Sequence, residues 1–245
     1  MEEGTTRDEF LRGRLVLRQP TRGARAGLDP LLLAAFVRDE RPKPGSVVDL
    51  GAGTGIVGLA VATLAPVTRL ALIELQPRLA ALARINADGA GFGERTVVVE
   101  GDLRRARSLG LGAHAFDLAV TNPPYAPANA GLRAVDAERA RSRHELTVTI
   151  GDVARAAATL VGGDGRLAVV FPAPRLPELL ASLAARGFGP RVGRLVHSTA
   201  DGPARVVLLL AHKGYKGGLT LRPPLIVHVD GGAYTPEVEA LLGGR

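Results

Sequence analysis

Residues 49–58 read Asp-Leu-Gly-Ala-Gly-Thr-Gly-Ile-Val-Gly, and an apolar run lies on each side of the glycines. The first run, Ser46–Leu50, has the length of a buried strand, and the second, Ile56–Leu64, continues as a short helix. Alternate glycines between a strand and a helix let a ligand approach the backbone beside the helix N-terminus. The segment therefore predicts a strand, a ligand-binding turn and a helix.

Strands and helices continue to alternate outward from this turn. We expect a preceding helix, Asp29–Val37, with Asp29 as its N-cap, and a later helix, Val153–Leu160, capped by Asp152. The other expected helices are 77–88, 103–109 (short and basic), 175–186 and one that begins at 235–237, and the other expected strands are 69–75, 96–100, 116–121, 166–171 (after a turn at 162–165), 191–197, 205–213 and 225–229. Repeated strand–helix units predict an α/β, Rossmann-like fold with a seven-stranded, mostly parallel sheet, one antiparallel C-terminal strand and helices on both faces.

Composition limits the class of protein. The 245 residues suit one core, and we expect a single domain over 1–245, with a basic N-terminal segment (1–28), an Arg-rich loop over the site (126–150) and a C-terminal extension (214–245). No apolar run is long enough to span a bilayer, and the N-terminus lacks a signal-peptide pattern. The absence of cysteine excludes disulfides, thiolate zinc sites and a cysteine nucleophile, and fits a cytoplasmic protein.

The formal net charge is +7, and almost all of the positive charge is arginine. Five arginines and no acid lie between Leu11 and Leu28, and a second group follows residue 132. Such clusters are often only solvated faces, but two of them that flank one site indicate a polyanion, with nucleic acid favoured. The candidate RNA-binding residues are Arg18, Arg22, Arg133, Arg139, Arg141 and Arg143.

The glycine turn suits two cofactor types. Its Gly-x-Gly-x-x-Gly spacing matches the dinucleotide fingerprint, with Glu74 at the end of the second strand as the ribose-binding acid. Asp49 before the glycines and Asp102 after the third strand favour S-adenosylmethionine instead, because these acids suit its cationic methionine end and its adenine amine. The candidate cofactor-binding residues are Asp49, Gly51, Ala52, Gly53, Gly55, Glu74, Asp102 and Asn122.

Each acid also has a simpler interpretation. Asp49 could satisfy turn amides, Glu74 could be a solvated acid at a strand end, and Asp102 could cap the helix that follows it. His144, Glu145 and His197 receive no role, and the histidines lack metal-ligand spacing, so no metal site is predicted.

The fourth strand, 116–121, ends in Asn122-Pro123-Pro124-Tyr125. Prolines have no backbone N–H, so this turn offers carbonyl acceptors without competing donors, and the Asn122 side-chain oxygen adds another. Tyr125 adds a flat ring. These four candidate catalytic residues predict a site that binds an NH₂ group attached to a planar π-system.

At this point the chain resembles class I S-adenosylmethionine-dependent methyltransferases that methylate amino groups. Within them it is similar to the bacterial valine-tRNA (adenine-37-N6) methyltransferases, which modify the adenosine 3′ of the anticodon. The residues that carry the resemblance are Gly27–Leu33, Asp49–Gly55, Glu74, Asp102, Asn122–Tyr125, Arg143–Glu145 and Arg222–His228. The resemblance implies the class I methyltransferase fold, S-adenosylmethionine as cofactor and N6-adenine methylation of tRNA or another structured RNA.

Other functions remain open from the sequence. Glutamine-amide N5 methyltransferases that act on release factors share the Asn-Pro-Pro-Tyr turn, but they usually carry a helical domain ahead of it, for which the basic segment before Asp49 is short. A DNA adenine methyltransferase would need a separate target-recognition segment, and the sequence shows none. A non-catalytic RNA-binding protein of this fold would be expected to have eroded motifs, and a nicotinamide-dependent oxidoreductase has no use for Asn-Pro-Pro-Tyr. The oligomeric state and the RNA itself are not predicted.

Overall fold

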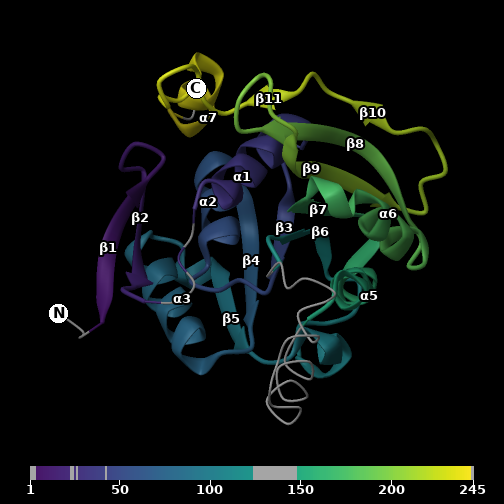
Figure 1. Ribbon diagram of the computed structural model, residues 1–245. Helices are drawn as coiled ribbons and strands as arrows, with labels where there is room; N and C mark the ends of the chain where they lie inside the picture. Colours follow the sequence, from purple (N-terminus) through teal and green to yellow (C-terminus); the bar gives the residue numbers. More distant parts are fainter. Residues whose placement is uncertain (1–3, 23–24, 26, 42, 124–147, 244–245) are drawn as a thin grey trace, which may run out of the picture.

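A computed structural model describes residues 4–22, 25, 27–41, 43–123 and 148–243 of the chain. Its centre is one large sheet with the strand order β10-β8-β9-β7-β6-β3-β4-β5, and β11 also pairs with β8 (Figure 1). The strands are β3 (Gly45–Leu50), β4 (Val67–Glu74), β5 (Thr96–Glu100), β6 (Phe116–Thr121), β7 (Val161–Pro172), β8 (Phe188–His197), β9 (Ala204–Lys213), β10 (Thr220–Leu221) and β11 (Leu225–Ile226). Strand β9 runs antiparallel to both of its neighbours, and the other pairs in this sheet are parallel.

The mostly parallel sheet with one antiparallel strand near the C-terminus is thus confirmed, but over the described residues the sheet has nine strands rather than the seven predicted. Strands β10 and β11, of two residues each, pair with the outer side of β8. Thr220 of β10 pairs with Val192, and Leu225 of β11 pairs with Val196. They were predicted only in part, as the strand 225–229, because two-residue strands carry no alternation of their own.

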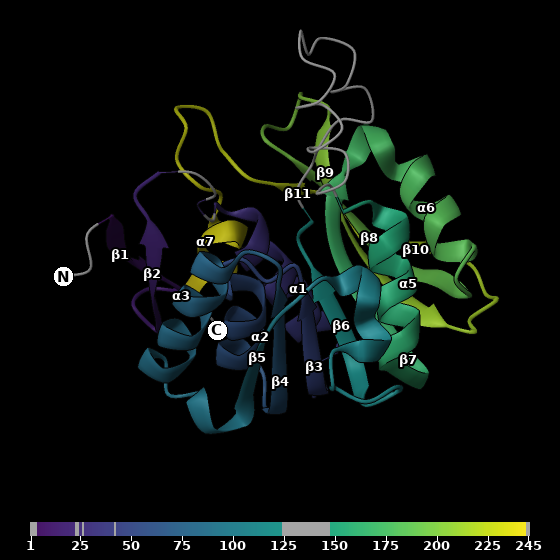
Figure 2. The same ribbon diagram turned by 90° about the horizontal axis from the view of Figure 1, so that it is seen from below.

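Helices cover both faces of the sheet, as the alternating pattern predicts (Figure 2). They are α1 (Asp29–Glu40), α2 (Ile56–Leu64), α3 (Pro77–Gly89), η2 (Leu103–Ser108), α5 (Ile150–Leu160), α6 (Leu176–Ala184) and α7 (Pro236–Gly243). Helices α1, α2, α3 and α7 share one apolar core, and η2, α5 and α6 share the other. Successive strand residues alternate between these cores: Val47 belongs to the first and Val48 to the second.

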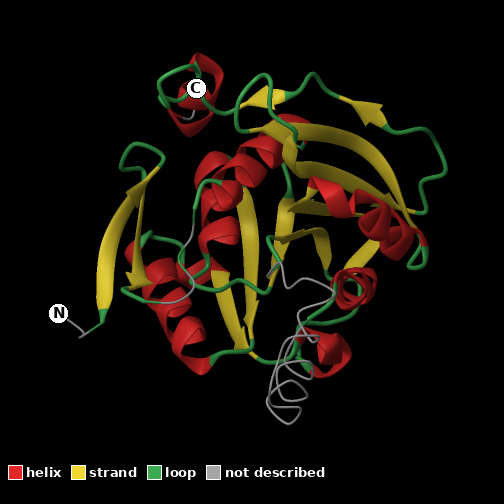
Figure 3. Cartoon of the chain, viewed as in Figure 1, coloured by secondary structure: helices red, strands yellow, loops and turns green. Residues whose placement is uncertain are grey.

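An antiparallel hairpin that the sequence did not indicate precedes the sheet. Strands β1 (Thr5–Phe10) and β2 (Leu15–Pro20) form it, and it stands beside α3 (Figure 3). The buried Asn86 of α3 holds it in place, because its Oδ1 accepts from the Arg18 N–H at 2.7 Å and its Nδ2 donates to the Arg18 carbonyl at 3.0 Å. The same Nδ2 donates to the Thr54 carbonyl at 2.9 Å, so one amide joins the hairpin to the glycine turn.

Two predicted helix caps are wrong. Helix α1 has Leu28 as its N-cap, and Asp29 lies inside the first turn, where its carboxylate pairs with Arg205. Helix α5 begins at Ile150 with Thr149 as its N-cap. Asp152 is the third residue of a capping box, so it helps to cap the helix from within rather than preceding it.

The glycines at 162–165, predicted as a turn, lie within strand β7. Val161 pairs with Phe116 of β6 and Arg166 pairs with Leu118, so five steps along β7 oppose two steps along β6. A Cβ on Gly165 would lie 2.4 Å from the Cβ of Val161, which shows how tightly this bulge folds back. The helix predicted over 175–186 begins as a 3-10 turn, Ala173–Arg175, and continues as α6.

Candidate functional site

The carboxyl ends of β6, β3, β4 and β5 meet at one edge of the sheet, since these strands are parallel neighbours. A cavity of about 500 Å³ lies at this edge. Its walls include seven predicted site residues, namely Gly51, Ala52, Gly53, Glu74, Asp102, Asn122 and Pro123. Asp49 and Gly55 are not among the residues that line it.

The glycine turn presents bare backbone to the cavity. Gly51 and Gly53 have φ values of +75° and +58°, and a Cβ on either would meet nothing within 4 Å. Gly58 serves the opposite need, because a Cβ there would lie 2.7 Å from Leu72 Cδ2 of β4. The turn thus leaves room for a ligand above it, while helix α2 packs closely on the strand below.

Glu74 fixes the position of the turn. Its Oε2 accepts from the Gly53 N–H at 2.8 Å and its Oε1 accepts from the Gln76 N–H at 2.8 Å. Only 6% of the residue is exposed, and it lines the cavity. The solvated-acid interpretation is therefore wrong for Glu74: both carboxylate oxygens face backbone donors at the cavity wall.

Asp49 lies beneath the turn. It is fully buried, and its Oδ2 accepts from the Gly58 N–H at 2.8 Å, whereas its Oδ1 has no hydrogen-bond partner among the described residues. Burial raises the pKa of Asp49 to about 7; the Gly58 hydrogen bond opposes this rise and the charge of Glu74 adds to it. Asp49 therefore acts on the turn from below rather than on the cavity directly.

Asp102 caps the helix that follows it, as the simpler interpretation held, and it also lines the cavity. Its Oδ1 accepts from the Arg104 N–H at 2.9 Å and so caps η2, and its carboxylate pairs with the Arg104 guanidinium at 2.8 Å. The hydrogen bonds from Arg104 lower the pKa of Asp102. Its place on the cavity wall leaves an ionised acceptor at the end of β5.

Asn122 and Pro123 follow directly on β6. The Thr121 hydroxyl donates to the Leu50 carbonyl at 2.8 Å, which ties the end of β6 to the end of β3. Asn122 is half-buried and Pro123 is buried. Pro124, Tyr125, Arg133, Arg139, Arg141, Arg143, His144 and Glu145 lie outside the described residues.

A second cavity, of about 390 Å³, shares Arg25, Pro30 and Asn122 with the first. Its walls also include His228 and Tyr234. Their rings stack, with centroids 5.3 Å apart and an interplanar angle of 22°. Tyr234 is 38% exposed, and the His228 Nδ1 lies 2.9 Å from the Gly232 carbonyl oxygen. Sequence reasoning missed this pair, although His228 ends the segment 222–228 that it singled out.

Three other residues named from the sequence, Arg18, Arg22 and His197, line neither cavity. Arg18 and Arg22 are exposed on and after β2. Arg25 donates to Asp8 at 2.5 Å and borders both cavities. The His197 Nδ1 lies 2.8 Å from the Gly202 carbonyl oxygen, a contact that closes the turn between β8 and β9.

Within the described part of the chain, no group of three or more histidine and acidic side chains is placed to hold a metal ion. The same residues include no helix that is long and apolar enough to cross a bilayer.

Comparison with known proteins gives consistent matches. The methyltransferase small domain family matches residues 29–171. The chain is 33% identical over 229 residues, covering 87% of it and 85% of the relative, to a Porphyromonas gingivalis protein named tRNA1(Val) (adenine(37)-N6)-methyltransferase. A Yersinia enterocolitica protein of the same name is 29% identical over 220 residues, covering 89% of this chain and 84% of that relative.

Solved structures share the fold. A protein from Agrobacterium tumefaciens, described as a predicted O-methyltransferase, superposes with a TM-score of 0.71 at 30% identity, covering 89% of this chain and 96% of that one. A geranyl diphosphate C-methyltransferase from Streptomyces coelicolor, in complex with S-adenosyl-L-homocysteine, has a TM-score of 0.54 at 12% identity over 74% of this chain and 80% of that one. The second likeness concerns the fold alone.

The raised pKa of Asp49 predicts a specific pH dependence of stability. The unfolded chain loses this proton near pH 4 and the folded chain near pH 7, so the stability that the protonated carboxyl contributes is full below pH 4 and is lost as the pH rises to 7. Between pH 5 and pH 8, Asp49→Asn should gain on the order of 2–3 kcal/mol relative to wild type. Urea unfolding at both pH values measures the difference.

The exposed Asp88, changed to Asn, is the matched control and should follow wild type. If the stability of Asp49→Asn also runs parallel to that of wild type, Asp49 is ionised throughout this range and the assigned cause is wrong.

Proposed function

Since this chain belongs to the family of the tRNA1(Val) (adenine(37)-N6)-methyltransferases, within the methyltransferase small-domain group, we propose that it transfers a methyl group from S-adenosylmethionine to the N6 amine of an adenosine in tRNA. The observation that carries this proposal is the position of Asn122, which lines two adjoining cavities at once. We assign the cofactor to the 500 Å³ cavity and the adenine base to the 390 Å³ cavity. We place the reaction in the cytoplasm, where tRNA is found, and assign 1–245 to one methyltransferase domain.

The residues of the 500 Å³ cavity fit S-adenosylmethionine. Glu74 supplies a carboxylate for ribose hydroxyls, Asp102 an acceptor for the adenine amine, and the backbone at Gly51 and Gly53 room for the methionine end. The buried carboxyl of Asp49 lies below that turn, and its Oδ1 has no hydrogen-bond partner among the described residues. When bound, the cofactor supplies an electrophilic methyl group on a sulfonium.

The chain's own part in the chemistry is to prepare the amine. The lone pair of an exocyclic adenine amine is delocalised into the ring, which makes the amine a poor nucleophile. Acceptance of its two N–H bonds by the Asn122 side-chain oxygen and the Pro123 carbonyl draws the nitrogen towards tetrahedral geometry. These acceptors also stand where positive charge develops during attack, so no strong general base is needed beforehand.

The second cavity is the route for the base. An adenine must leave its stack to reach the end of a strand, and it then needs a new surface to stack on. The rings of Tyr234 and His228 provide such a surface beside Asn122. We propose that the flat ring of Tyr125 also stacks on the base. Arg18 and Arg22 on the hairpin side, together with Arg133, Arg139, Arg141 and Arg143, are proposed to hold RNA phosphates.

Two other groups could receive the methyl group in place of the adenine amine: a hydroxyl and a glutamine side-chain amide. The Agrobacterium protein is described as a predicted O-methyltransferase, and glutamine-amide methyltransferases share the Asn-Pro-Pro-Tyr turn. A hydroxyl has one proton and cannot donate to both the Asn122 oxygen and the Pro123 carbonyl. A glutamine side chain has no aromatic ring to stack on His228 and Tyr234. The site therefore favours a planar aromatic amine.

The function is tested with the full chain, radiolabelled S-adenosylmethionine and bulk tRNA from a strain that lacks the enzyme. We expect N6-methyladenosine in the digested RNA by nucleoside mass spectrometry. Label that appears only in protein, or only on a hydroxyl, would replace the proposal by one of the two alternatives.

Asn122→Ala should lower the rate of methyl transfer by about 10²–10³-fold, because one of the two acceptors is lost. Binding of tRNA, measured by filter retention, should stay unchanged. Asn122→Asp keeps an acceptor oxygen and should retain more activity than the alanine variant. Equal turnover by wild type and Asn122→Ala would remove Asn122 from the mechanism.

Asp102→Ala should weaken cofactor binding by about tenfold, the equivalent of about 1.4 kcal/mol, without changing tRNA affinity. Arg104→Ala is the control, since it removes the ion pair but leaves the carboxylate on the cavity wall. Calorimetry with S-adenosylhomocysteine distinguishes the two roles. Equal losses in both variants would mean that Asp102 only caps η2.

Tyr234→Ala should raise the KM for tRNA by about tenfold, because the base loses a stacking surface. Tyr234→Phe keeps the ring and should behave like wild type. Val229→Ala, which shortens another exposed side chain of the same loop, is the second control. An unchanged KM in Tyr234→Ala would place the base elsewhere.

A further inference from the structure

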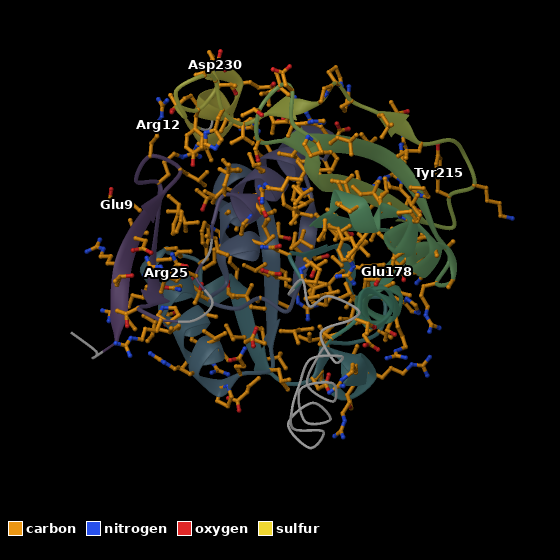
Figure 4. All side chains as sticks on the ribbon, in the orientation of Figure 1. Glu9, Arg12, Arg25, Glu178, Tyr215 and Asp230 are labelled. Atoms are coloured by element: carbon orange, nitrogen blue, oxygen red, sulfur yellow. The ribbon has the colours of Figure 1, made fainter. Side chains whose placement is uncertain are left out.

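A third cavity, of about 590 Å³, lies away from the two cavities that share Asn122. Its walls include Glu40, Arg41, Arg166, Arg191, His212 and Arg222. Arg166 pairs with Leu118, near the amino end of β6, and Arg191 lies near the amino end of β8. The cavity is therefore towards the amino ends of the parallel strands, whereas Asn122 follows the carboxyl end of β6. Figure 4 shows Tyr215, which also lines this cavity, and Arg25, which lines both cavities at Asn122, on opposite sides of the molecule.

The walls carry an excess of positive charge. Glu40 is the single carboxylate among the described residues that line the cavity, and Arg222 already binds it through Nε at 2.9 Å and Nη2 at 3.2 Å. Arg41, Lys43, Arg166 and Arg191 form no salt bridge with a described residue. The Nε of Arg41 is buried without a hydrogen-bond partner in the same part of the chain.

Arg41, Arg166 and Arg191 lie close enough for their charges to act on one another, although Arg191 is itself exposed. Burial lowers the pKa of Arg166, and the charges of Arg41 and Arg191 lower it further, while the charges of Asp164 and Asp117 oppose this fall. The pKa of His212 falls to about 4 through burial and through the charges of Arg166, Arg191 and Arg41. His212 is therefore neutral at pH 7, and its Nε2 accepts from the Arg166 Nε at 3.1 Å, which orients that guanidinium.

The arrangement differs from an ordinary solvated basic face. Arg41 follows α1, Arg166 lies in β7 and Arg191 lies in β8, so three separate elements bring their charges to one concave site. Repulsion between them costs stability unless an anion offsets it. Guanidinium groups present paired N–H donors that match the oxygens of a phosphate.

We propose that this cavity binds a phosphate group, held mainly by Arg41, Arg166 and Arg191. The phosphate belongs either to the backbone of an RNA or to a free phosphorylated molecule, and the chemistry of recognition is the same for both. The site stands apart from the proposed methyl-transfer site, so it can be tested without methyl transfer.

The probe for the site is inorganic pyrophosphate, titrated into the full chain at low salt and followed by calorimetry. The double variant Arg41→Gln/Arg191→Gln should bind pyrophosphate at least tenfold more weakly than wild type. The control Arg84→Gln/Arg186→Gln removes the same charge from exposed positions outside the cavity and should bind like wild type.

The Tm of the double variant, measured with and without pyrophosphate, shows whether the variant still folds. Because the double variant relieves repulsion, its Tm without anion should equal or exceed that of wild type, and pyrophosphate should raise the Tm of wild type only. A variant that loses stability without anion would contradict the repulsion on which the proposal rests.

The same three proteins identify the source of the phosphate through the salt dependence of tRNA affinity. A slope of log K against log salt that falls by about 1–2 in the cavity variant alone assigns the site to RNA phosphates. An unchanged slope with lost pyrophosphate binding assigns it to a free phosphorylated ligand. If neither pyrophosphate nor tRNA binding differs between the cavity variant and the control, the proposal is wrong.

Discussion

Parallel pairing of β6, β3, β4 and β5 brings the ends of four strands to one level of the sheet. Asp49 of β3 pairs with Val120 of β6 and with Leu72 of β4, and Glu74 of β4 pairs with Glu100 of β5. A shift of one residue in any pair would turn each strand's side chains to the opposite face. The glycine turn, the two acids that line the cavity and Asn122 converge because this register holds, and both cavities at that edge depend on it.

The two edges of the sheet carry opposite charge. Carboxylates gather at the carboxyl ends, where Glu74 and Asp102 receive backbone donors and Asp49 is buried beneath them. Guanidinium groups gather at the amino ends around His212. At the amino ends the guanidinium groups repel one another; at the carboxyl ends burial and the charge of Glu74 disfavour ionisation of Asp49, whereas Arg104 stabilises the Asp102 carboxylate. Such local conflicts within a well-packed core are typical of sites that a ligand completes.

Much of this arrangement follows from local sequence. Strands β5 and β6 and helix α2 have the predicted bounds, because glycines, acids and prolines interrupt their apolar runs cleanly. The hairpin escaped prediction since its position depends on Asn86, which is 68 residues from Arg18. The glycines at 162–165 resembled a turn, but the neighbouring strand keeps them in β7. The arginine cavity was equally invisible, because residues 41, 166 and 191 meet only through the topology.

Asn86 couples the N-terminal hairpin mechanically to the glycine turn. Its side chain grips the backbone of Arg18 in the hairpin and the carbonyl of Thr54, which lies between two glycines of the turn. Any movement of β2 away from α3 must stretch or break the hydrogen bonds between Asn86 and Arg18. The same side chain bonds Thr54, so this movement also affects the turn. One buried amide thus links the position of the hairpin directly to that of the glycine turn.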